Sequence, residues 1–143
     1  MAGPALWDSP DGRVVYLWCE DDAIKAFRLG DRRLEAQPVA KGAIPNHGSP
    51  GGSLTVTSNA KQSGSGIVWA THTKNQSADA GNAPGVLRAF DAETLRELWN
   101  SEQTPKRDRL GTLVKFVTPL VVAGRVYIPN YDNAVNVYGL LSQ

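Results

Sequence analysis

A threefold repeat is the feature of this sequence that most limits what it can fold into. A glycine precedes a β-forming run three times, in the stretches GRVVYLW, GIVWA and GRVYI, which begin at Gly12, Gly66 and Gly124. Each run has an aromatic residue at the matching point, and these residues are Tyr16, Trp69 and Tyr127. Self-similarity of this kind indicates a repeat architecture, in which every copy forms the same unit of secondary structure.

Two further patterns accompany each glycine run. After it come IKAF (residues 24–27), LRAF (87–90) and VNVY (135–138), in which apolar residues alternate with a polar one and an aromatic residue ends the run. A period of two is typical of a strand with one face toward a core. Before each glycine lies another β-forming stretch, the first of which is PALW. The same succession of three predicted strands therefore occurs three times along the chain.

A fourth strand is predicted in the first two units, at residues 32–39 and 96–100, and the third unit ends without one. Four antiparallel strands per unit at this spacing are typical of the blades of a β-propeller. We therefore predict a single all-β domain over residues 1–143, a partial propeller of three blades whose last blade lacks its outer strand. The blades would cover about residues 4–40, 51–101 and 114–141.

The stretch LRAFDAETLRELW at residues 87–99 admits two interpretations. Its second half contains good helix formers, and Asp91 is a suitable N-cap. Only Leu95, Leu98 and Trp99 are apolar there, however, and a short isolated helix is marginal in water. We therefore predict a strand, a tight turn and a second strand.

The same stretch resembles the tryptophan-docking motif of the PQQ-like, or quinoprotein-type, β-propellers, commonly written A-x-D-x-x-T-G-K-x-x-W. Arg96 stands for the lysine, and Leu95 stands where the motif has glycine, so the turn should be less permissive of a positive φ. Four residues match the motif: Ala89, Asp91, Thr94 and Trp99. The resemblance implies that the tryptophan packs between adjacent blades and that the aspartate and the threonine tie the turn.

The resemblance also implies where such a chain belongs. It identifies the chain with the C-terminal three blades of a larger propeller, and it implies a periplasmic or secreted protein. The opening stretch MAGPALWDSP has neither the basic nor the apolar region of a secretory leader, so no signal peptide is expected in this chain.

Long polar loops are expected on one face of the three blades, at residues 41–51, 71–85 and 101–113. Binding residues collect on such loops because a rigid scaffold holds them in place. Arg107 suits a carboxylate ligand, and solvated loop charge is the competing interpretation. The ligand-binding candidates on this face are His47, His72, Arg107, Asp108 and Asp132.

No catalytic residue and no metal ligand is predicted. His47 and His72 lack the spacing of a metal site. Three adjacent acids in a tight turn, Glu20, Asp21 and Asp22, cannot all point inward to hold calcium.

Three functions stay open from the sequence. The first is a non-catalytic scaffold that binds further protein or a small ligand and needs no cofactor. The second is a fragment of a PQQ-dependent quinoprotein dehydrogenase, in which PQQ with calcium would bind only if other blades completed the site. The single cysteine, Cys19, cannot form the neighbouring-cysteine disulfide of several such enzymes. The third resembles the periplasmic propellers of outer-membrane assembly, which act by binding a partner protein.

The expected partners follow from the number of blades. Propellers usually have 4–8 blades, so three need further blades of the same polypeptide or a second copy to complete a ring. The formal net charge of +1 gives no clustered basic surface for nucleic acid. No apolar run reaches the ~18 residues that a membrane span needs.

Overall fold

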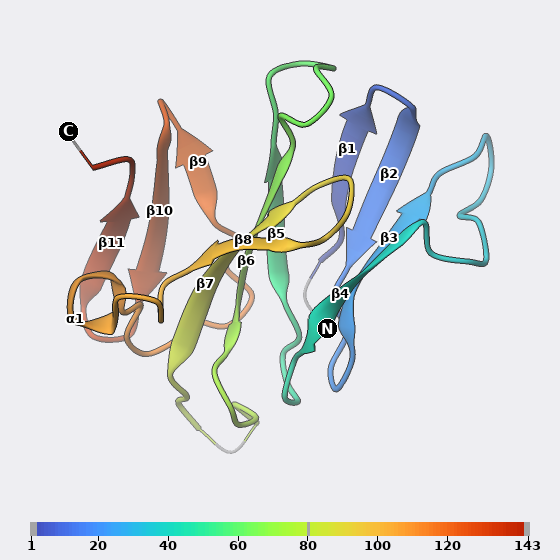
Figure 1. Ribbon diagram of the computed structural model, residues 1–143. Coiled ribbons are helices and arrows are strands. Elements are labelled where there is room, and N and C mark those ends of the chain that lie inside the picture. The colour runs from blue at the N-terminus through green and yellow to red at the C-terminus, as the bar shows by residue number, and fades with distance from the viewer. Residues whose placement is uncertain (1–2, 80, 142–143) are drawn as a thin grey trace.

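The computed structural model describes residues 3–79 and 81–141, which form three antiparallel sheets in chain order (Figure 1). The first sheet contains β1 (Ala5–Ser9), β2 (Gly12–Leu17), β3 (Ala23–Arg28) and β4 (Ala40–Pro45). The second contains β5 (Ser53–Thr57), β6 (Ile67–Thr73), β7 (Gly85–Asp91) and β8 (Glu97–Asn100). The third contains β9 (Leu120–Val122), β10 (Arg125–Asn130) and β11 (Ala134–Tyr138). The prediction of an all-β chain with sheets of four, four and three strands is confirmed.

Each sheet is a meander, in which every strand pairs with the next one along the chain. The second sheet lies between the first and the third, and the strands that open the sheets are neighbours: β1 contacts β5, and β5 contacts β9 (Figure 1). One short helix, α1 (Pro105–Asp108), interrupts the connection from β8 to β9. No helix in the described part of the chain is long and apolar enough to cross a membrane.

The sequence repeat is also a repeat of strand register. In every sheet the repeated aromatic residue of the second strand lies opposite the residue that precedes the aromatic residue of the third strand. The three pairs are Tyr16 with Ala26, Trp69 with Ala89, and Tyr127 with Val137. Equivalent positions of the three sheets can therefore be compared directly.

Two hydrophobic clusters hold the sheets together, and β7 contributes to both because its side chains alternate between its two faces. Phe90 packs with Trp18 and Tyr16 in the cluster between the first and second sheets. Leu87 packs with Val126 and Ile128 in the cluster between the second and third sheets. The second sheet is therefore covered on both faces.

The outer strand of the first sheet differs from its predicted place. It is β4, whereas residues 32–39 belong to the connection that precedes it. The first sheet accordingly runs to Pro45 and takes in part of the segment predicted as a loop at 41–51. A polar segment that contains Pro38 is a poor strand because proline cannot donate to the hydrogen-bond ladder.

The connection from β7 to β8 is a tight turn, so the helical alternative for residues 91–100 is wrong. Asp91 Oδ1 accepts hydrogen bonds from the Thr94 N–H and from the Thr94 hydroxyl, both at 2.8 Å. The Thr94 hydroxyl oxygen accepts the Arg96 N–H at 3.3 Å. Leu95 adopts a φ of +57° even though it is not glycine. Its side chain is 2% exposed, and this burial offsets the backbone strain.

Candidate functional site

His72 lies inside β6, is buried, and is the inner end of a chain of polar side chains that continues through the partly buried Arg88 and Glu97. Its Nε2 accepts a hydrogen bond from Arg88 Nε at 2.7 Å, and the Arg88 guanidinium also pairs with Glu97 of β8. The Trp18 ring covers the imidazole, with 4.5 Å between ring centroids. Burial, and then the charge of Arg88, lower the pKa of His72 to about 3, so the imidazole is neutral at pH 7. A buried, neutral and hydrogen-bonded histidine serves the packing of the first two sheets.

The other histidine, His47, lies exposed in the connection from β4 to β5. Its backbone carbonyl accepts the Thr73 hydroxyl at 3.3 Å, which ties this connection to the end of β6. Only the backbone of His47 has a role in that contact. The imidazole is left at the surface.

Arg107 and Asp108 form an ion pair with each other at the end of α1. Arg107 Nε and Nη2 donate to the two carboxylate oxygens of Asp108 at 2.6 and 2.7 Å. These hydrogen bonds lower the pKa of Asp108, so the carboxylate stays ionised and does not supply a proton at neutral pH. Because each charge neutralises the other, the pair is more suited to holding α1 in place than to acid–base catalysis.

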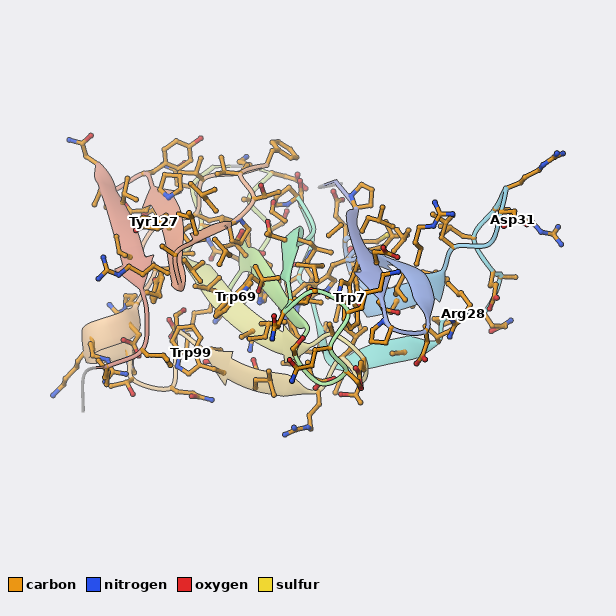
Figure 2. All side chains as sticks on the ribbon, turned by 90° about the horizontal axis from the view of Figure 1, so that it is seen from above. Trp7, Arg28, Asp31, Trp69, Trp99 and Tyr127 are labelled. Atoms are coloured by element: carbon orange, nitrogen blue, oxygen red, sulfur yellow. The ribbon has the colours of Figure 1, made fainter. Side chains whose placement is uncertain are left out.

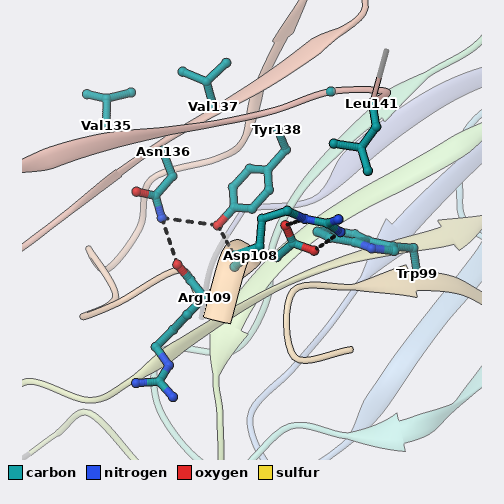
Figure 3. A pocket seen from close by; sticks show the side chains of 10 residues that line it. Trp99, Asp108, Arg109, Val135, Asn136, Val137, Tyr138 and Leu141 are labelled. Carbon is teal, nitrogen blue, oxygen red and sulfur yellow. Dashed lines mark hydrogen bonds and ion pairs between the residues drawn. The ribbon is translucent and has the colours of Figure 1, made fainter. Parts of the chain in front are cut away.

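The same ion pair lines a pocket with a volume of about 600 Å³. On one side lie Trp99 and the segment 107–109, and on the other side lies β11 with Gly139 and Leu141 (Figure 3). The Tyr138 hydroxyl donates to the Asp108 carbonyl at 3.1 Å, and the Asn136 amide donates to the Leu110 carbonyl at 2.8 Å. The end of α1 is thereby fastened to β11, and the pocket opens beside this junction.

Asp132 lies apart from these groups, in the hairpin between β10 and β11. Its carboxylate accepts the Thr112 N–H at 2.9 Å and the Thr112 hydroxyl at 2.6 Å. These hydrogen bonds lower the pKa of Asp132. The carboxylate thus links the hairpin to the segment that leads into β9.

Of the residues of the docking motif, Trp99 contacts the third sheet. Trp99 of β8 packs against the Tyr138 ring of β11, with centroids 5.7 Å apart and ring planes at 63°. Ala89 lies opposite Trp99 in the β7–β8 pair and is 3% exposed. Trp99 is only partly buried, and its exposed surface forms a wall of the pocket.

The five ligand-binding candidates therefore do not form one site. The structure places His72 between the first two sheets, pairs Arg107 with Asp108 beside the third sheet, and ties Asp132 to the β10–β11 hairpin. Within residues 3–79 and 81–141, no three His, Cys, Asp or Glu side chains are grouped to hold a metal ion. The acids of the first tight turn instead bond to the protein itself: Asp21 accepts the Gly48 N–H and Asp22 accepts the Ala23 N–H.

Asn136 and Tyr138 are the pocket residues that sequence reasoning missed. Both were assigned only to a repeated strand, where the alternation VNVY explains them. The one available signal was that an asparagine stands at an inward position of this strand, where it requires a polar partner. Comparison with protein-family models, with curated proteins and with solved structures found no match.

Proposed function

We propose that this chain is a non-catalytic scaffold, a PQQ-like β-propeller segment whose two outermost sheet faces bind further sheets of the same kind. One observation supports this proposal above all. The residues exposed on the two outermost sheet faces occupy register positions whose equivalents in the other sheets are buried between sheets. The meandering sheets and the contacts of β1 with β5 and of β5 with β9 support the propeller arrangement.

Each sheet has a back row, which faces the next sheet along the chain. In the first sheet this row is fully covered by the second sheet, and in the second sheet Trp69 packs toward the third. In the third sheet the same row is uncovered: Leu120 is 61% exposed and Val137 is 53% exposed. The three back rows are Ala5, Tyr16 and Ala26; Thr55, Trp69 and Ala89; Leu120, Tyr127 and Val137.

Each sheet also has a front row, which faces the preceding sheet. In the second and third sheets these residues belong to the two hydrophobic clusters. In the first sheet Leu6 is 57% exposed, beside the half-buried Val15 and Phe27. The three front rows are Leu6, Val15 and Phe27; Val56, Val68 and Phe90; Val121, Val126 and Tyr138.

Between neighbouring sheets of this chain, the back row of one sheet packs against the front row of the next. The two uncovered rows are one of each kind, so they complement each other. Either further blades of the same polypeptide or a second copy would bury them. Two copies joined front to back would make six blades, within the usual range of a closed propeller. On this proposal the chain needs no cofactor, PQQ with calcium would require blades beyond these three, and a periplasmic or secreted location follows from the resemblance.

Sedimentation velocity over a range of concentrations tests this proposal with two variants. Leu6→Glu puts a charge on the uncovered front row, and Leu120→Glu puts one on the uncovered back row. We expect the unmodified chain to associate and each variant alone to stay monomeric, because every contact needs one row of each kind. An equimolar mixture of the two variants should regain a dimer, since each supplies the row that the other has lost.

The control is Leu98→Glu in β8, which is 42% exposed and belongs to neither uncovered row. This variant should associate like the unmodified chain. A monomeric unmodified chain with a cooperative melt would refute the proposal. Association of either single variant, or failure of the mixture to form a dimer, would refute the front-to-back contact.

A further inference from the structure

The outer edge of the third sheet is a second unpaired surface, separate from the uncovered rows. In the described residues β11 pairs with β10 alone, whereas β3 and β7 each have an outer partner strand. Pro129 lies opposite Val135 and has no N–H, so these two residues form a non-hydrogen-bonded pair. The alternation of an antiparallel ladder then directs the N–H and C=O groups of Val135 and Val137 to the outer edge.

The pocket lined by Arg107 and Asp108 follows this edge. Consecutive residues 135–138 all line it, although the side chains of Val135 and Val137 point to the opposite face from those of Asn136 and Tyr138 (Figure 3). Residues of both faces line one pocket only where the strand backbone itself forms the wall. The pocket is therefore a groove beside the free backbone groups, with Trp99 on the opposite wall.

The rim of this groove is positively charged. Lys106 and Arg109 are exposed and make no ion pair with the described residues, and Arg109 lines the groove. Arg125 lies at its far end, where a Cβ at Gly139 would be 3.5 Å from the Arg125 side chain. The one carboxylate in the lining, Asp108, is already neutralised by Arg107. An edge-to-edge dimer through β11 would bring like charges together.

We propose that the groove along β11 binds an extended acidic segment of a partner protein by β-strand addition. Backbone groups of the segment would pair with those of Val135 and Val137. Acidic side chains would meet Arg109 and its basic neighbours, and apolar side chains at alternate positions would cover Trp99 and Tyr138. Main-chain pairing supplies affinity in this mode of recognition, and the charged rim selects the sequence. The site uses the backbone edge of Val137, whereas the propeller proposal uses the side chain of the same residue in the uncovered back row.

Two fluorescein-labelled, end-blocked octapeptides test the site by fluorescence anisotropy, one alternating valine with glutamate and the other valine with lysine. We expect the glutamate peptide to bind at least about tenfold more tightly, and to lose about tenfold in affinity with Arg109→Glu. Arg32→Glu, in the exposed β3–β4 connection, is the matched charge control and should leave binding unchanged.

A second pair of variants tests the backbone pairing. Val137→Pro removes an N–H that points to the groove and leaves the ladder with β10 complete, so it should abolish binding. Val137→Thr keeps that N–H and should bind the glutamate peptide normally. In amide NMR spectra of the unmodified chain, the Val135 and Val137 resonances should shift when the peptide is added. Equal binding of the two peptides, or full binding by a folded Val137→Pro protein, would overturn the proposal. Sedimentation of the same variants shows whether a loss of peptide binding is accompanied by a loss of self-association, which would point to the uncovered rows instead.

Discussion

Tyr16 allows the contact between the first two sheets to be measured directly. Its ring is fully buried, and its hydroxyl donates to the Ala92 carbonyl at 2.7 Å, in the turn after β7. Burial raises the pKa of this phenol, so it stays protonated and remains a donor. Tyr16→Phe keeps the packed ring and removes only the donor, which leaves a buried carbonyl without its partner. Such a loss costs about 1–3 kcal/mol, so we expect the melting temperature to fall by roughly 5–10 °C in calorimetry.

The repeat itself provides the control. Tyr127 occupies the equivalent register position in the third sheet (Figure 2), but there it faces the uncovered side and its hydroxyl donates to no described residue. Tyr127→Phe should therefore leave the melting temperature within about 1 °C. Equal effects of the two substitutions, or no effect of Tyr16→Phe, would refute the view that this hydrogen bond joins the first two sheets.

Three further predictions concern single positions. The pKa of His72 is lower in the folded chain than the ordinary 6.5 of the unfolded chain, so stability is full above pH 6.5 and falls as the pH drops toward 3. Urea titrations should show a loss of about 2 kcal/mol between pH 7 and pH 5, and His72→Gln should remove this loss. Leu95→Gly should destabilise the chain by about 1 kcal/mol less than Leu95→Ala, because glycine relieves the positive φ and alanine does not; the opposite order in calorimetry would contradict the strain. Gly66→Ala should cost about 1–3 kcal/mol in the same assay, because its Cβ would lie 2.9 Å from the Trp7 ring, while Gly3→Ala, with open space around it, should be neutral.

Most of the strands were predictable because their signal is local. Three patterns of β-forming residues, each repeated three times, marked nine of the strands, and the separate prediction of a fourth strand at residues 96–100 marked β8. The exception is β4, whose inward residues are Ala40, Gly42 and Ile44. Small residues carry a weak hydrophobic pattern, and Gly42 is small because a Cβ there would lie 2.6 Å from Ile24. The need for a small residue at this position comes from a contact with the neighbouring strand, so the pattern within β4 does not reveal it.

The candidate site was less predictable for the same reason. Residue type and loop position selected Arg107 and Asp108, which do line the pocket beside β11, and the same criteria selected His72, which is buried. His72 is buried because β6 continues to Thr73, so this residue lies in the strand and not in the loop that follows it. The contact of α1 with Tyr138 joins segments far apart in the sequence, and no local pattern records it.

The two hydrophobic clusters differ in size, and we expect this difference to decide which part of the molecule opens first. The cluster between the first two sheets is the larger one, and it includes the fully buried rings of Tyr16 and Phe90, which lie on the regular strands β2 and β7. The cluster under the third sheet includes Leu110 and Leu113, which come from a connection rather than from a strand. Amide hydrogen exchange should accordingly divide the chain into two cooperative units, with β9 to β11 exchanging through a lower-energy opening while the first two sheets stay closed. The chain would then unfold from its carboxyl-terminal sheet inward.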